Sequence, residues 1–127
     1  MNNFKIIFHI SNVLFLILYL FPGSIIGYFL YDDIHSTPDL TKNFFVSSNH
    51  FYSYFLISYL GLYAYYETRK KTIYIYLIII SILTETLHLI IPRRAFEFID
   101  LFCNILGFAL AVISFLTFVH IKKNDKK

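Results

Sequence analysis

Two apolar runs joined by a short charged turn decide the fold. Residues 72–121 read TIYIYLIIISILTETLHLIIPRRAFEFIDLFCNILGFALAVISFLTFVHI. Each run is long enough to supply the roughly 20 apolar residues that a transmembrane helix needs. Proline cannot continue a helix, so we expect Pro92 to end the first run. The stretch therefore predicts a hairpin of two transmembrane helices.

Two more apolar runs precede this hairpin. We predict one all-α domain over residues 1–127, an integral membrane bundle of four transmembrane helices in contact with the lipid bilayer. The predicted spans are 4–21, 48–66, 72–91 and 96–121.

The segment between the first two spans contains further helix signals. The first run stops at Pro22 and Gly23, and no small-residue cleavage site follows, so we interpret it as a retained helix rather than a signal peptide. The apolar residues after Gly23 either extend that helix past a kink or lie at the membrane interface. Thr37 followed by Pro38 predicts the start of a short interfacial helix.

The composition excludes several classes of protein. Of the 127 residues, 57% are hydrophobic and 15% are charged, whereas a soluble domain is about half apolar and about a quarter charged. A chain this short cannot bury so much apolar surface in its own interior. We therefore exclude a nucleic-acid-binding domain, a cofactor-sized α/β enzyme and a disordered chain. Cys103 is the single cysteine, which excludes an intramolecular disulfide, and no cofactor motif occurs, so we predict no cofactor.

The basic residues predict the orientation. With the N-terminus in the cytoplasm, eight of the 11 Lys and Arg residues lie inside, and Lys42, Arg93 and Arg94 lie outside. The positive-inside rule therefore favours cytoplasmic positions for both termini.

Polar residues inside the predicted spans gather towards the outer face. The candidate site residues are His50, Tyr54, Glu85, His88, Arg93, Arg94, Asp100 and Asn104. By helical rise, Glu85 lies about 9 Å and Asp100 about 6 Å below the outer boundary. Because ionisable groups within a membrane are costly, they mark a functional site by default.

The charges suggest a role for each group. A guanidinium grips a carboxylate or a phosphate through two parallel hydrogen bonds. We expect one of Arg93 and Arg94 to pair with Glu85 or Asp100, while the other faces a ligand. In this interpretation Arg94 binds a phosphate, Asp100 orients Arg94, and Glu85 or His88 acts as the catalytic acid or base.

Two other interpretations of the polar residues remain open. Intramembrane polar groups also join helices, and we favour this role for Asn104 together with Gly107, which permits close helix approach. A metal site is the second alternative. The candidate ligands are His50, Glu85, His88 and Asp100. The spacing of Glu85 and His88 resembles that of helical-bundle metal sites, but the sequence fixes no other ligand, so we predict no metal.

Residues 84–113, TETLHLIIPRRAFEFIDLFCNILGFALAVI, resemble the signature of VanZ-like membrane proteins. The resemblance covers about residues 46–115. Matching positions are Glu85, Pro92, Arg94, Asp100, Asn104 and Gly107, with an earlier match at His50, Phe51 and Tyr54. Departures are His88 in place of a glutamine, Arg93 in place of a small residue such as glycine, Ala111 in place of a second glycine, and Val46 and Ser47 in place of an acidic-lysine pair.

The resemblance implies a four-span protein of the bacterial cytoplasmic membrane with an outer-leaflet ligand. The family is named for a member linked to teicoplanin resistance, so the resemblance also implies a link to antibiotic resistance.

The sequence thus supports three functional hypotheses. The first is a protein that binds or modifies a phosphate-bearing cell-envelope lipid or lipid-linked precursor. The second is a non-enzymatic structural subunit whose polar residues only lock helices together. The third is a small pore-forming protein, which the confinement of polar groups to one leaflet disfavours. Whether any reaction is catalysed, and the oligomeric state, are left open by the sequence.

Overall fold

The computed structural model of the chain describes residues 2–38, 41 and 47–125. These residues form an all-helical structure without any strand. The helices are α1 (Asn2–Leu20), α2 (Ile25–Tyr31), α3 (Ser48–Leu87) and α4 (Phe98–Asn124). The prediction of an all-α fold is confirmed.

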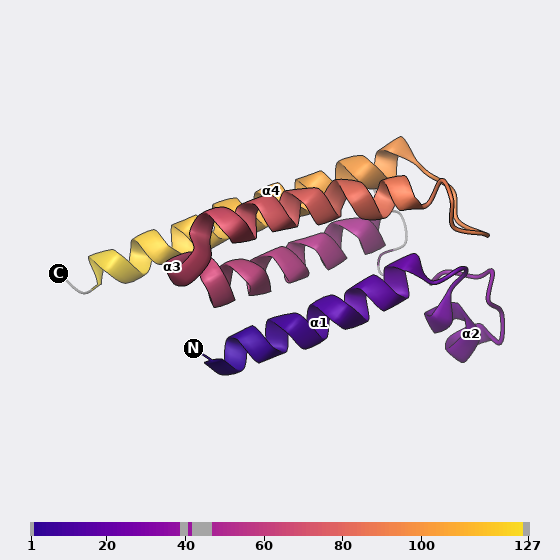
Figure 1. Ribbon diagram of the computed structural model, residues 1–127, viewed down its shortest axis with the longest axis horizontal. Helices are drawn as coiled ribbons and strands as arrows, with labels where there is room; N and C mark the ends of the chain where they lie inside the picture. The colour runs from indigo at the N-terminus through magenta and orange to yellow at the C-terminus, as the bar shows by residue number, and fades with distance from the viewer. Residues whose placement is uncertain (1, 39–40, 42–46, 126–127) are drawn as a thin grey trace.

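Helix α3 is a hairpin of two helices rather than one straight rod. Arg69, with φ −145° and ψ 49°, interrupts its helical backbone, and the chain folds back at this bend (Figure 1). The two halves correspond to the predicted second and third spans, and the first half begins at Ser48 as predicted. No separate loop joins them, because a single non-helical residue makes the reversal.

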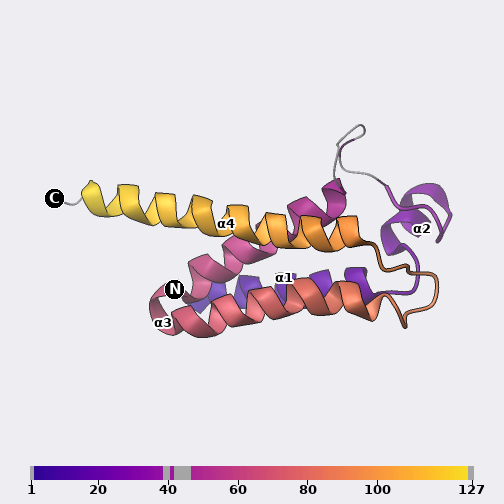
Figure 2. The same cartoon turned by 90° about the horizontal axis from the view of Figure 1, so that it is seen from above.

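Four long helical segments therefore run side by side in alternating directions. The N-terminus of α1, the bend in α3 and the C-terminus of α4 lie at one end, and α2 lies at the opposite end (Figures 1 and 2). We call these the bend end and the α2 end. Lys5 lies near the start of α1, Lys70 follows the bend at Arg69, and Lys122 is in the last turn of α4, so these three lysines belong to the bend end.

The apolar residues after Gly23 do not continue helix α1 past a kink. Helix α1 ends before Pro22, and Gly23 adopts φ +121°, where a side chain would be strained. The next apolar residues form the separate helix α2, whose first turn is capped by Ser24 Oγ accepting from the Gly27 N–H at 2.9 Å. Thr37 and Pro38 are not helical, and most of the interfacial helix predicted after them falls outside the described residues.

The turn between α3 and α4 differs from the prediction. Helix α3 ends at Leu87, before Pro92, so proline does not stop it. Instead the backbone tightens, with the His88 N–H donating to Glu85 O at 3.1 Å. Helix α4 then begins at Phe98 rather than at residue 96.

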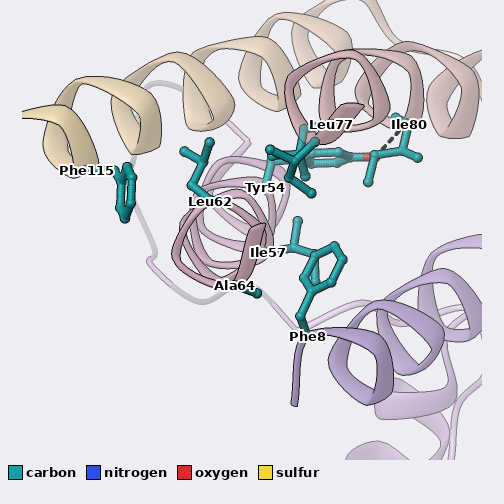
Figure 3. Close-up of a cluster of buried hydrophobic side chains, with 9 residues drawn as sticks. Phe8, Tyr54, Ile57, Leu62, Ala64, Leu77, Ile80 and Phe115 are labelled. Atoms are coloured by element: carbon teal, nitrogen blue, oxygen red, sulfur yellow. Dashed lines mark hydrogen bonds between the residues drawn. The ribbon is translucent and has the colours of Figure 1, made fainter. Parts of the chain in front are cut away.

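The apolar core extends from the bend end of the bundle to Tyr54, one helical turn from His50. It includes Phe8 of α1, Leu62 and Leu77 from the two halves of α3, and Phe115 of α4 (Figure 3). Helices α3 and α4 approach closely at Gly107, where an added Cβ would lie 2.5 Å from Phe51 O. This contact agrees with the predicted role of Gly107 in close helix packing.

Much of the apolar surface faces outwards. Two helical segments among the described residues, Asn3–Leu20 and Phe98–Asn124, are long and apolar enough to cross a membrane, and only 17% and 28% of their apolar windows are buried. The core helix of a soluble protein would be mostly buried. Large exposed apolar surfaces mark contact with another apolar phase, so the two helices favour membrane association.

Candidate functional site

Four helical termini meet at the α2 end and bring polar side chains together. The start of α3 supplies His50, its last turn supplies Glu85, the turn after it supplies His88, and the first turn of α4 supplies Asp100. We call these four residues the histidine–carboxylate cluster. The sequence predicted this convergence from residues up to 50 positions apart, and the structure contains it.

Short distances join the members of the cluster. His50 Nε2 lies 3.2 Å from Asp100 Oδ2, and His50 Nδ1 lies 3.7 Å from Glu85 Oε2. His88 Nδ1 lies 3.4 Å from the same Glu85 oxygen. The Glu85 side chain is 0% exposed, whereas His50 retains 13% and Asp100 16% of side-chain exposure. The cluster is therefore accessible from the side of His50 and Asp100.

Glu85 has one carboxylate oxygen that accepts a hydrogen bond and one that does not. Oε1 accepts from the Glu97 N–H at 3.1 Å, next to the N-terminus of α4, where the helix dipole favours negative charge. Oε2 is buried and makes no hydrogen bond. A buried carboxylate oxygen is costly without a partner, so this atom points to a proton or a cation.

Asn104 fixes the tautomer of His50. Its Nδ2 donates to Ser81 O at 3.2 Å, which turns Oδ1 towards His50 Nδ1 at 3.0 Å. An amide oxygen only accepts, so His50 Nδ1 carries the hydrogen. The neutral ring then has its lone pair on Nε2, facing the Asp100 carboxylate.

His88 is oriented in the same way by the backbone of α1. Its Nε2 lies 3.1 Å from Tyr19 O, and a carbonyl only accepts, so Nε2 carries the hydrogen. The lone pair of the neutral ring is on Nδ1, which faces Glu85. Two imidazole lone pairs thus face two carboxylates, an arrangement that needs positive charge between them.

Tyr19 is a site residue that the sequence analysis missed. Its hydroxyl contacts His50 Nδ1 and donates to Asn104 Oδ1 at 3.1 Å, and its ring stacks on His88 with centroids 5.9 Å apart. A tyrosine is common near the end of a transmembrane helix, so composition alone did not distinguish it. The available signal was its position in the sequence, because Tyr19 lies two residues before the outer end of the predicted span 4–21.

Arg94 does not form the predicted ion pair. Its Nε donates to Phe21 O at 3.1 Å and its Nη2 to Leu18 O at 3.2 Å, so it caps the C-terminus of α1. Among the described residues, the carboxylates of Glu85 and Asp100 pair with histidines and with no arginine. The expectation that Asp100 orients Arg94 is therefore wrong, because the last backbone carbonyls of α1 take the guanidinium instead.

Two other predicted ligand residues lie away from the cluster. Arg93 is exposed and adopts φ 63°, a left-handed conformation that favours glycine. Tyr54 is buried in the core, where its hydroxyl donates to Ile80 O at 3.2 Å (Figure 3). The same hydroxyl contacts Thr84 Oγ1. Tyr54 joins the two halves of α3. Asn104 on α4 makes hydrogen bonds to residues of α1 and α3, which supports its predicted role in joining helices.

A pocket of about 330 Å³ opens beside the cluster. His50, His88 and Arg94 form part of its lining, and apolar side chains form much of the remaining wall. The apolar lining comes from α1, α2 and the loop after it: Phe15, Leu18, Ile25, Ile26, Leu30 and Pro38. The pocket therefore offers one ligand both a basic and an apolar surface.

Comparisons with protein-family models, with curated proteins and with solved structures each give no match to this chain. The resemblance to VanZ-like proteins thus stays a prediction from the spaced residues of the hairpin.

Proposed function

We propose that this chain is a VanZ-like, four-span protein of the bacterial cytoplasmic membrane that binds or modifies a phosphate-bearing envelope lipid. The observation that carries the proposal is the pocket between α1, α2 and α3, with His50, His88 and Arg94 beside an apolar wall. A lipid has the same division, with a charged headgroup attached to apolar chains. We also propose that both termini lie in the cytoplasm. This orientation would place the pocket in the outer leaflet.

Arg94 supplies the positive charge for the headgroup. A guanidinium has five N–H donors, and two of those of Arg94 donate to Leu18 O and Phe21 O. The remaining donors are free to bind phosphate oxygens, which accept paired hydrogen bonds from the planar guanidinium group. The two carbonyl contacts hold the group in place before the ligand arrives.

The cluster supplies the chemical groups for the proposed modification of the lipid. His88 Nδ1 lies 3.4 Å from Glu85 Oε2, and the His88 side chain also lines the pocket. Proton transfer by positioned histidine and carboxylate groups is the ordinary basis of acid–base catalysis. The link to glycopeptide resistance rests on the family resemblance alone.

Native mass spectrometry of the protein extracted gently from its own membrane tests the binding proposal. We expect the wild type to retain a phosphorus-containing lipid. Ser53 lines the pocket, so Ser53→Leu should fill it and lower lipid occupancy severalfold. Ser114→Leu, on the exposed face of α4, is the matched control and should retain the lipid. Equal lipid occupancy in all three forms would contradict the proposal.

A structural-subunit role is the second candidate. Its supporting observation is the set of interhelical hydrogen bonds made by Tyr54 and Asn104. Under this alternative, substitutions in the cluster lower thermal stability while lipid occupancy follows only the amount of folded protein.

A further inference from the structure

We propose that His50, Glu85 and Asp100 form a binding site for one divalent transition-metal ion, with Zn²⁺ as its best probe. One ligand atom from each residue lies within 4.8 Å of the other two. The proposal concerns the cluster itself and does not depend on whether a lipid occupies the neighbouring pocket.

The three ligand atoms lie within 4.8 Å of one another, so they must move closer by up to about 1.4 Å to hold a zinc ion. Zinc binds nitrogen and oxygen ligands at about 2.0–2.2 Å, which places tetrahedral ligand atoms about 3.4 Å apart. His50 Nε2 and Asp100 Oδ2 are already 3.2 Å apart. Glu85 Oε2 is buried and without a hydrogen bond, so it has an unused lone pair directed into the cluster.

The neighbouring residue Asn104 prepares His50 for a metal. Metal-bound histidines usually donate their second ring N–H to a fixed acceptor, which sets the tautomer and the ring orientation. His50 Nδ1 donates to Asn104 Oδ1 at 3.0 Å, and this leaves Nε2 as the coordinating atom. Asn104 is held in turn by its bond to Ser81 O.

Charge and access also agree with a divalent ion. Two carboxylates contribute two negative charges to a largely buried site, and one divalent cation neutralises both. Histidine with carboxylate ligands suits zinc and similar first-row ions. Three protein ligands leave a fourth position open, and His50 borders the pocket. Such an open position is typical of zinc sites that bind a further ligand.

Isothermal titration of the full-length, tag-free protein with Zn²⁺ after chelator treatment tests the proposal. We expect one equivalent to bind, and affinity to fall about 100-fold or more in His50→Ala and in Asp100→Asn. His120→Ala is the matched control, because His120 is exposed on α4 and bonded to Asn124, and it should bind like the wild type.

Absorption-edge spectroscopy of the zinc-loaded wild type gives a readout that needs no variant. We expect a shell of nitrogen and oxygen atoms, an imidazole signature and no sulfur. Absence of stoichiometric zinc binding by folded wild type would overturn the proposal and leave protons as the charge that balances the cluster. Binding that persists unchanged in both His50→Ala and Asp100→Asn, or a sulfur ligand, would overturn it equally.

Discussion

Two groups of buried polar side chains lie about one helical turn apart, and they differ in how their bonding is satisfied. The hydroxyl pair, Tyr54 and Thr84, bonds internally and to the Ile80 carbonyl, with no charged member. The histidine–carboxylate cluster has a buried oxygen on Glu85 with no hydrogen bond. The first group is complete within the protein, whereas the second requires additional positive charge.

This difference separates helix packing from ligand binding. Polar groups that only join helices need a partner on the neighbouring helix and nothing more. Such a role explains the hydroxyl pair fully. It does not explain why two imidazole lone pairs face two carboxylates at 3.2 and 3.4 Å. This difference supports our proposal that the cluster binds a ligand, while the hydroxyl pair supports the fold.

The largest expected effect is that of Glu85→Gln on the binding of Zn²⁺. Glutamine can still accept from the Glu97 N–H, and its amide can donate to the lone pair of His88. We therefore expect the free energy of unfolding to stay within about 1 kcal/mol of wild type, while zinc affinity falls about 100-fold. Calorimetric titration and detergent-phase unfolding measure the two quantities. A large loss of stability with unchanged zinc affinity would remove the distinction between the groups.

Arg94→Ala tests whether Arg94 supports the fold, as the hydroxyl pair does. Arg94 borders the pocket, yet it donates hydrogen bonds to the carbonyls of Leu18 and Phe21, so it also stabilises the fold. An intramolecular hydrogen bond contributes about 0.5–1.5 kcal/mol net, so we expect the loss of both bonds to cost about 1–3 kcal/mol. Arg93→Ala is the control on the exposed neighbour. Equal effects of the two substitutions in denaturant unfolding would contradict the capping role.

Tyr54→Phe should lower stability and leave zinc affinity unchanged, which is the reverse of the effects expected for Glu85→Gln. The substitution removes the hydroxyl that joins the two halves of α3, and Thr84 keeps its own bond to Ile80 O at 2.8 Å. We expect a loss of about 1 kcal/mol in stability and unchanged zinc affinity. Thermal unfolding beside titration measures both. Loss of zinc binding in folded Tyr54→Phe would show that the two groups act as one.

The smallest effect should come from Arg93→Gly, which has the opposite sign. Arg93 adopts φ 63°, and glycine reaches this conformation without strain. Relief of strain, less the greater freedom of glycine in the unfolded chain, should leave stability equal to wild type or higher by less than about 1 kcal/mol. Denaturant unfolding of Arg93→Gly and Arg93→Ala side by side measures the conformational term. A stability of Arg93→Gly below that of wild type would contradict the expected relief of strain.

Sequence patterns predicted the fold and much of the cluster for clear physical reasons. Apolar run lengths fixed the helical segments, and helical spacing placed Glu85 with His88 on one face. Charge costs inside apolar runs drew attention to His50 and Asp100. These signals depend on local periodicity and on the rarity of buried charge, both of which a sequence records directly.

Other features of the site were not predictable because they depend on backbone partners and on helix rotation. Arg94 donates to backbone carbonyls. Every residue has a backbone carbonyl, so the sequence does not indicate which ones Arg94 binds. Glu85 Oε1 likewise meets a backbone N–H. Tyr19 reaches the cluster only through the rotation of α1 about its axis, and Tyr54 faces the core by the rotation of α3. Side-chain type and spacing specify neither rotation.

Native mass spectrometry of the wild type, Glu85→Gln and Tyr54→Phe tests the central claim most directly. The claim is that the histidine–carboxylate cluster binds a ligand, while the hydroxyl pair supports the fold. After incubation with one equivalent of Zn²⁺, we predict a zinc adduct on the wild type and on Tyr54→Phe, and little or none on folded Glu85→Gln. The same adduct on all three forms, or an adduct on none, would contradict the account.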